Sequence, residues 1–211
     1  MADSVLDNGV FCCTHLSMKD ERDIVHFAVG APEGMGLVSY IQRHAILDER
    51  AGRMRTYIVR DNLTDELVGY FSLKAGLISY SERRFLWRSE FDTIPGIELA
   101  GFAVNDGYIQ KHPRSKGIGF VIFSDFIRPI IGRAAEYIGA RILYIFALPY
   151  PKLLQQYQSR YGFQRLSPKH EAQVHRRLKP RYDEGCVFMY QSIDDAALRT
   201  FIAGKSCAAR G

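Results

Sequence analysis

The sequence lacks long hydrophobic runs, paired cysteines and a large excess of either charge. Its 211 residues contain no apolar stretch near the roughly 18 residues that a membrane-spanning helix needs. The start, Met1-Ala2-Asp3-Ser4, lacks the basic-then-apolar pattern of a secretory signal. We therefore expect a cytoplasmic protein that does not enter a membrane. The four cysteines have neither zinc-ligand spacing nor a compact disulfide pattern, so we expect reduced thiols and no metal.

The composition is that of one globular domain. With 47% hydrophobic and 24% charged residues, the chain can bury a full core. We expect a single domain over residues 1–211 with its core at about 54–192. The net charge of +5 permits an anionic partner, including a nucleic acid, but does not indicate one.

Strand and helix patterns alternate along the chain. Ser17 stands three residues before Asp20, which is typical of a helix N-cap. Residues 75–95 lack a clear pattern and are expected to form an irregular insertion. Pro129 predicts a kink or break in a long apolar helix. The patterns predict strands at 9–16, 54–59, 67–73, 97–104, 142–148, 163 onward and 186–191, and helices at 17–30, 36–46, 117–137, 150–160, 169–178 and 194–202.

The strongest motif is Arg114-x-x-Gly117-x-Gly119, which follows an apolar strand and opens the long apolar helix. Backbone N–H groups at a helix N-terminus bind anions, and glycines let a pyrophosphate approach them closely. A role for both glycines as turn residues alone stays open. The adjacent cations Arg114 and Lys116 favour the anion site.

The segment from about Thr56 to Gln191 resembles the GNAT superfamily of N-acetyltransferases. The resemblance rests on the strand, the glycine loop, the helix after it and the Tyr161-Gly162-Phe163 turn. It implies a mixed α/β (α+β) fold, with a mostly antiparallel central sheet, a splayed central strand and flanking helices. It also implies acetyl-CoA as acyl donor. The CoA pyrophosphate would bind at Arg114, Ser115, Lys116, Gly117, Ile118 and Gly119, and pantetheine at the main chain of Phe102, Ala103 and Val104.

The resemblance also implies that the amide near Val104 binds the oxyanion of the tetrahedral intermediate. One departure from the family pattern is the segment 105–113, which is longer than usual. We expect it to form either a longer bulge loop or part of the acceptor pocket.

Two residues are candidates for acid–base catalysis. Glu98 lies six residues before Val104, the spacing at which several family members carry a general-base glutamate. An amine acceptor with a pKa of about 10 must lose a proton before attack. A solvated or ion-paired Glu98 is the alternative, and His112 is a weaker candidate base. Tyr157 is the candidate general acid, although Gln158 occupies the family's usual register, so a packing role for Tyr157 also stays open.

Three functions remain open from the sequence. The first is an N-acetyltransferase that moves an acetyl or short acyl group from acetyl-CoA to a primary amine, by direct attack in a ternary complex. The second is a toxin-like GNAT enzyme acting on aminoacyl-tRNA, suggested by the basic charge and the cluster Arg83, Arg84, Trp87 and Arg88. The third is a non-catalytic acyl-CoA-binding module, suggested by the displaced tyrosine. The resemblance also makes a homodimer an expectation.

A Rossmann nucleotide site does not fit the sequence. Its fingerprint needs a third glycine where this chain has Ile122, and a βαβ unit where this chain has a predicted hairpin.

Overall fold

The computed structural model describes residues 4–85, 88–115, 117–177 and 185–193. Its residues group into two compact units. Unit 1 comprises Met1–Lys74 and Leu99–Ile127, and unit 2 comprises Ala75–Glu98 and Arg128–Gly211. The two long strands β4 (Leu67–Phe85) and β5 (Arg88–Val104) contribute to both units.

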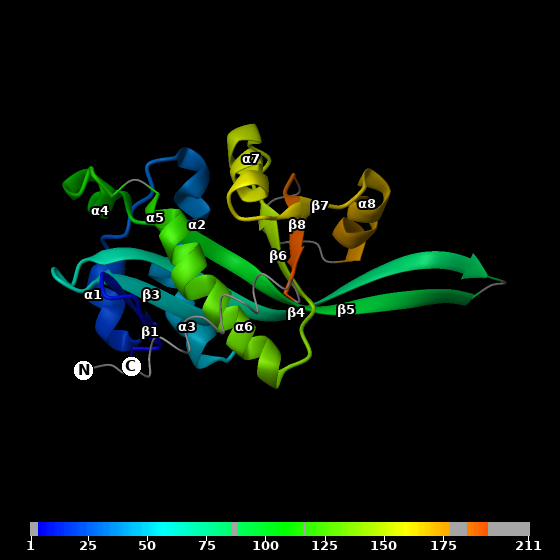
Figure 1. Ribbon diagram of the computed structural model, residues 1–211, viewed down its shortest axis with the longest axis horizontal. Helices are drawn as coiled ribbons and strands as arrows, with labels where there is room; N and C mark the ends of the chain where they lie inside the picture. The colour runs from blue at the N-terminus through cyan, green and yellow to red at the C-terminus, as the bar shows by residue number, and fades with distance from the viewer. Residues whose placement is uncertain (1–3, 86–87, 116, 178–184, 194–211) are drawn as a thin grey trace. The chain divides into compact units, whose positions relative to one another are not determined.

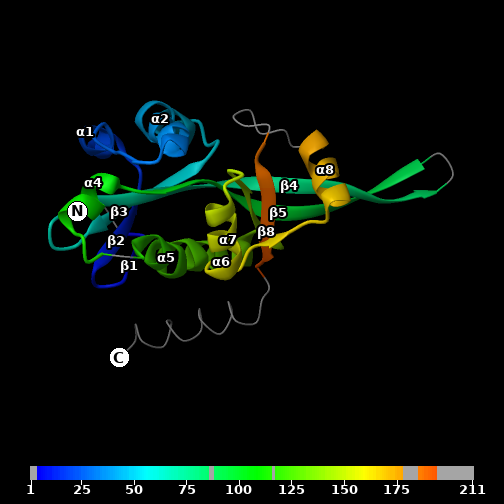
Figure 2. The same ribbon diagram turned by 90° about the horizontal axis from the view of Figure 1, so that it is seen from above.

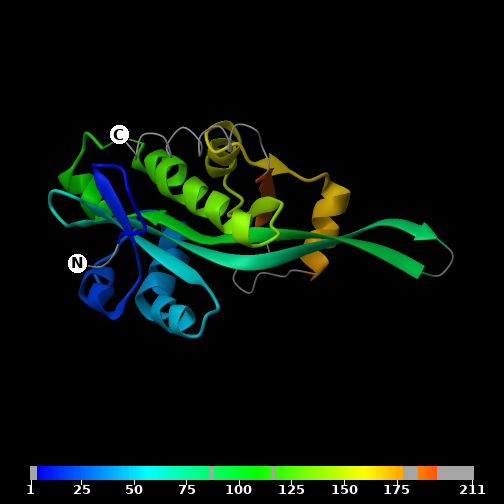
Figure 3. The ribbon, with the colours of Figure 1, turned by 60° about the horizontal axis from the view of Figure 1, so that its bottom comes forward.

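Unit 1 contains a sheet with helices on both faces. Its strand order is β1-β2-β3-β4-β5, and the pairs β1–β2, β2–β3 and β3–β4 are antiparallel. The helices α1 and α2 cover one face of this sheet and α5 lies on the other (Figures 2 and 3). Besides β4 and β5, the elements are β1 (Leu6–Asp7), β2 (Phe11–His15), η1 (Met18–Asp20), α1 (Glu21–Ile24), η2 (Pro32–Gly34), α2 (Met35–Arg43), α3 (Ala45–Arg50), β3 (Arg55–Asp61), α4 (Asp106–Lys111), α5 (Ile118–Ile122) and the π-helical turn η3 (Phe123–Ile127).

The core beneath α1 and α2 explains why their apolar positions recur at helical spacing. One side chain from each turn reaches the sheet, and these side chains bury against strand residues. The cluster contains Ile24, Phe27, Val38, Ile41 and Ala45 from the helical region, and Leu16, Ile58, Leu67, Tyr70 and Ala103 from the strands and their ends.

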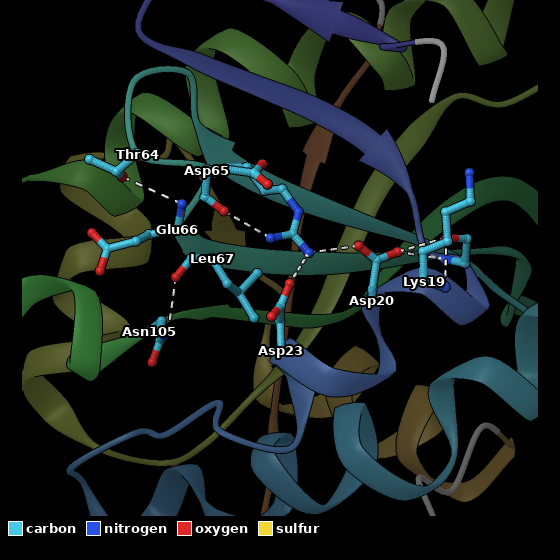
Figure 4. A network of polar contacts seen from close by, with 10 residues as sticks. Lys19, Asp20, Asp23, Thr64, Asp65, Glu66, Leu67 and Asn105 are labelled. Atoms are coloured by element: carbon cyan, nitrogen blue, oxygen red, sulfur yellow. Dashed lines mark hydrogen bonds and ion pairs between the residues drawn. The ribbon is translucent and has the colours of Figure 1, made fainter. Parts of the chain in front are cut away.

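A capping box starts the first helical segment, as the sequence predicts. The Ser17 side chain accepts from the Lys19 amide, and the Asp20 carboxylate accepts from the Ser17 amide at 2.8 Å. Arg60 of β3 binds the same carboxylate at 2.8 Å, Asp23 at 2.6 Å and the Asp65 carbonyl at 2.9 Å (Figure 4). This network joins the helical segment to the β3–β4 hairpin.

Unit 2 contains the strand order β5-β6-β8-β7. The parallel pairing of β5 with β6 covers Gly96–Glu98 against Ile142–Tyr144, whereas β8 is antiparallel to both β6 and β7. Its core contains Ile78, Ile142, Tyr144, Val174 and Phe188. The remaining elements, labelled in Figure 1, are α6 (Arg128–Tyr137), β6 (Ile142–Ala147), α7 (Pro151–Ser159), β7 (Gln164–Arg165), α8 (Pro168–Arg177) and β8 (Val187–Ser192).

The expected irregular insertion at 75–95 is wrong. Strand β4 extends to Phe85 and β5 begins at Arg88, so the segment is mostly two long strands. Its aromatic and β-branched residues suit strands, and Ile78 is buried in the unit 2 core. The strand preference of these residues decides the local structure, although the arginines among them interrupt the regular alternation of polar and apolar residues.

The other predicted strands and helices in the described ranges are confirmed in type, but several differ in extent. The first helical stretch ends at Ile24 instead of near Gly30, and the second divides into α2 and α3 at His44. The predicted helix at 194–202 lies outside the described residues. Every helix in the described part of the chain is too short or too polar to cross a membrane.

The helix after the glycine loop breaks where Pro129 predicts. A π-helical turn, Phe123–Ile127, separates α5 from α6, in which Pro129 is the second residue. A π turn inserts an extra residue into the helical pattern. This change accommodates a ring that would otherwise clash with a carbonyl one turn earlier.

Candidate active site

The glycine loop forms the N-terminus of α5. Gly117 is the N-cap and has φ +86°, a left-handed conformation that favours glycine. Its carbonyl accepts from the Phe120 amide at 2.8 Å, which closes the first helical turn. The first N–H groups of a helix have no acceptor within it, so a loop of this kind presents donors to an anion. Arg114 is exposed beside it, and Lys116 lies outside the described residues.

Gly69 of β4 brings α5 close to the end of β5. A Cβ at this position would lie 2.7 Å from the Ala103 carbonyl oxygen, 3.4 Å from the Val104 Cα and 3.0 Å from Ile122 Cδ1. Only a glycine leaves room for both neighbours. Unit 1 therefore places the predicted pantetheine segment Phe102–Val104 and the helix that carries the pyrophosphate loop against the same point of β4.

The segment 105–113 forms helix α4 instead of a bulge loop. Asn105 is its N-cap, accepting from the Gly107 amide at 3.2 Å while its own amide group donates to the Leu67 carbonyl at 2.9 Å. Its aromatic face also binds the β3–β4 hairpin. The Tyr108 hydroxyl donates to Asp61 at 2.5 Å, and His112 Nε2 lies 2.7 Å from Glu66 Oε2. His112 is thus engaged in a hydrogen bond with the hairpin.

Glu98 is buried within unit 2. Its side chain is 6% exposed, which rules out the solvated strand-edge alternative. Glu98 pairs in register with Tyr144 of β6, and the Tyr144 hydroxyl donates to Glu98 Oε2 at 3.3 Å. A buried carboxylate with a hydrogen-bond donor is a reasonable proton acceptor in a catalytic site.

Tyr157 lies on α7 of unit 2, in contact with two aromatic rings. Its ring centroid is 5.5 Å from that of Tyr161 and 5.6 Å from that of Phe163. Burial of the hydroxyl, with a smaller contribution from Tyr161, raises the pKa of Tyr157 above its ordinary value. The phenol therefore stays protonated, as a general acid must be. Gln158, in the usual family register, is exposed.

An open pocket of about 210 Å³ lies in unit 2. Ile142 of β6 forms part of its wall. Tyr144 is two residues further along the same strand, so the two side chains share one face of β6. Its wall is mostly aliphatic and aromatic and consists of Ile78, Ile94, Ile142, Leu166, His170, Phe188 and Tyr190.

The predicted residues thus fall into two sets. Unit 1 holds the predicted donor-binding residues, and unit 2 holds Glu98 and Tyr157. The sequence analysis did not identify Tyr144 and Tyr161 as neighbours of the candidate base and acid. Only Tyr161 carries a weak signal in the sequence, through its place in the Tyr161-Gly162-Phe163 turn. In the described ranges, the acidic, histidine and cysteine side chains form no group of three that could hold a metal ion. The aromatic and arginine cluster at 83–88 lies where the structure describes no side chains.

No protein-family model matches the chain. Several solved structures have the same fold. A tyrosine-to-phenylalanine variant of the AtaT toxin aligns with a TM-score of 0.65 and 17% identity, covering 90% of this chain and 93% of that one. AtaTR bound with acetyl-CoA aligns with a TM-score of 0.61 and 18% identity, covering 90% and 97%. The KacTA–DNA complex aligns with a TM-score of 0.63 and 17% identity, covering 92% and 99%.

At this level of identity the likeness establishes the fold. It confirms the mixed α/β architecture expected from the sequence, with a mostly antiparallel sheet, one parallel strand pair and flanking helices.

Proposed function

We propose that the chain is an acetyl-CoA-dependent N-acetyltransferase that acts on a primary amine by direct attack in a ternary complex. The observation that carries this proposal is that Gly117, in a left-handed conformation, starts α5, and that Gly69 lets this helix lie close to the end of β5. The same fold occurs in AtaTR, which was solved with acetyl-CoA bound.

Unit 1 supplies the donor site in this proposal. The amides of Gly117, Ile118 and Gly119 bind the CoA pyrophosphate, and Arg114, Ser115 and Lys116 add further donors and positive charge. The main chain of Phe102–Val104 pairs with pantetheine. The Val104 amide then stabilises the negative charge on the thioester oxygen as the tetrahedral intermediate forms.

Unit 2 supplies the proton transfers. Glu98 takes a proton from the ammonium form of the acceptor, which has no lone pair until it is deprotonated. The amine nitrogen then forms a bond with the thioester carbonyl carbon. When the carbon–sulfur bond breaks, Tyr157 gives its proton to the CoA thiolate, and no covalent enzyme intermediate forms.

Calorimetric titration with acetyl-CoA tests the donor without knowledge of the acceptor. We expect micromolar binding of acetyl-CoA and much weaker binding of NADH, which also carries an adenosine and a pyrophosphate. Dephospho-CoA separates the contribution of the 3′-phosphate. Absence of acetyl-CoA binding would reject the proposal. Binding without turnover in an acceptor screen would support the non-catalytic acyl-CoA-binding module instead.

A second candidate acceptor is the amine of an aminoacyl-tRNA. The observation that favours it is that the similar structures include toxins, and that two of them are of complexes with DNA. Under this candidate, binding of tRNA should weaken steeply with salt, because each phosphate contact releases counterions. Acetylation of aminoacyl-tRNA but not of free amines would establish it. The reverse preference would establish a small amine or protein amine as acceptor.

The same candidate includes a protein partner. AtaT has been solved with the C-terminus of the antitoxin AtaR and acetyl-CoA. We propose a corresponding antitoxin-like partner for this chain, a cytoplasmic location and a homodimer. Light scattering of the purified protein tests the homodimer, and co-purification of a second protein with the tagged chain tests the partner.

A further inference from the structure

The hydrogen bond from Tyr144 to Glu98 joins two residues that are 46 positions apart in the sequence. Both side chains are nearly inaccessible to solvent, with 2% and 6% exposure. The Tyr144 ring is held by Phe188, with ring centroids 5.7 Å apart, and by an edge-to-face contact with Phe146 at 6.1 Å. The ring is therefore held by one neighbour on the same face of β6 and by one on the adjacent strand β8, and its hydroxyl reaches the carboxylate.

Gly76 of β4 makes the space that this hydroxyl occupies. A Cβ at position 76 would overlap the Tyr144 hydroxyl oxygen and lie 2.7 Å from Cζ of the same ring. Gly76 does not have a positive φ, so its backbone conformation is open to any residue. Position 76 needs a glycine because any side chain would collide with Tyr144.

We propose that Tyr144 is a positioning residue for Glu98, and that Gly76 preserves the space for its hydroxyl. A buried carboxylate is costly unless it is hydrogen-bonded. By donating to Oε2, Tyr144 stabilises the carboxylate and fixes the orientation in which it receives the proton of the acceptor. This inference rests on the proposed function, because it assigns a role to Tyr144 through the base.

The first test replaces Tyr144 by phenylalanine, which keeps the ring and removes only the hydroxyl. Turnover is followed as CoA thiol release from acetyl-CoA, with ethylamine as a small amine probe and separately with water as the nucleophile. We expect Tyr144→Phe to lower kcat about tenfold, the loss typical of one hydrogen bond to a charged group. The calorimetric Kd for acetyl-CoA should not change. Tyr40→Phe is the matched control, since its hydroxyl contacts the Met54 sulfur at 3.2 Å in unit 1.

A double-mutant cycle with Glu98→Gln separates positioning from general packing. If Tyr144 acts through Glu98, Tyr144→Phe should cause no further loss of kcat in the Glu98→Gln background. A merely structural role would lower kcat in both backgrounds by the same factor, and that result would overturn the inference.

Gly76→Ala tests the space for the hydroxyl. We expect it to lower kcat at least as much as Tyr144→Phe, whereas Gly139→Ala, where a Cβ would meet nothing within 4 Å, should leave kcat unchanged. Unchanged kcat in both Tyr144→Phe and Gly76→Ala would overturn the inference while leaving the transferase proposal intact. If the unsubstituted protein binds acetyl-CoA but releases no CoA with ethylamine, water or an aminoacyl-tRNA, the proposed function fails and the inference fails with it.

Discussion

Tyr108 and His112 stack on one side of α4, with ring centroids 4.3 Å apart and an angle of 27° between the rings. Both rings also bind the β3–β4 hairpin, Tyr108 through Asp61 and His112 through Glu66. Arg114 follows His112 by only two residues. The stacked pair thus fixes the chain immediately before the predicted pyrophosphate loop.

Tyr108→Phe should destabilise unit 1. The Tyr108 side chain is 4% exposed, and its hydroxyl donates to the Asp61 carboxylate, whose pKa is lowered mainly by this bond. Loss of a hydrogen bond to a charged group costs about 2 kcal/mol. Urea denaturation near neutral pH measures this cost. Tyr40→Phe removes a hydroxyl whose partners, the Met54 sulfur and the hydroxyls of Thr56 and Ser72, carry no charge, so it should cost less. An equal cost in both variants would contradict the role of the Asp61 bond.

Glu66→Gln should reduce stability in a pH-dependent way. Lys111 and then His112 lower the pKa of Glu66 from 4.5 to about 2. Because the folded-state pKa is depressed, the stabilisation is present above pH 4.5 and is lost as the pH falls toward 2. Urea denaturation of both proteins between pH 6 and pH 3 should show curves that converge on acidification. A difference that grows toward low pH would contradict this assignment.

Gly69→Ala should destabilise the protein by about 2 kcal/mol, through overpacking between β4, Ala103 and Ile122. The Ala103 carbonyl is backbone and cannot move away as a flexible side chain would. Gly36→Ala is the matched control, because Gly36 is exposed in α2 and a Cβ there meets nothing within 4 Å. That variant should be stabilised by up to about 1 kcal/mol through the better helix propensity of alanine. Thermal unfolding of both variants tests the opposite signs.

Arg114→Glu should weaken acetyl-CoA binding at least about tenfold, because it replaces a donor to phosphate by a repelling charge. Arg43→Glu makes the same charge change at an exposed residue of α2, which lies on the opposite face of the unit 1 sheet from α5 (Figure 2). Calorimetry should show near-normal affinity for Arg43→Glu. Equal affinities of the two variants would remove Arg114 from the donor site.

Tyr157→Phe should lower kcat about 100-fold or more, the usual scale for loss of a general acid, and leave the Kd for acetyl-CoA unchanged. Burial raises the pKa of Tyr157, so the acid form persists and kcat should not decline below about pH 10 through loss of this proton. Tyr161→Phe is the comparison, since Tyr161 receives a hydrogen bond from Gln156 at 3.3 Å. A larger effect at Tyr161 would transfer the role of general acid to that residue.

Local signals in the sequence predicted most of the fold. The Ser17 cap, the β3–β4 hairpin and the break before Pro129 follow from a few adjacent residues and are confirmed. Helix α4 was not predicted although Asn105-Asp106 is a typical helix start, because six residues are too few to show a helical periodicity. The extension of β4 and β5 was not predicted, because charged residues interrupt the alternation of polar and apolar side chains in this segment.

The candidate site was less accessible from the sequence than the fold. Glu98 was found by its spacing from Val104, but its partner depends on the register of two parallel strands. That register is set by tertiary packing, and nothing near Tyr144 in the sequence indicates it. The same holds for Gly76, whose requirement for glycine arises from a ring on another strand. The roles of Glu98, Tyr157 and the loop residues, and the single domain over 1–211, stay predictions.

The π-helical turn at Phe123–Ile127 also explains why the sequence from 117 to 137 looks apolar almost all round. Each α-helical residue advances the direction of its side chain by about 100°, so one inserted residue shifts the phase of everything that follows. Ile118, Ile122, Phe126 and Ile130 are buried at a constant spacing of four residues, which is longer than the roughly 3.6 residues of one α-helical turn. The wider π turn offsets part of this difference. Deleting one residue within the turn would rotate the side chains after the deletion by about 100° relative to those before it. The length of this stretch is therefore as constrained as its composition.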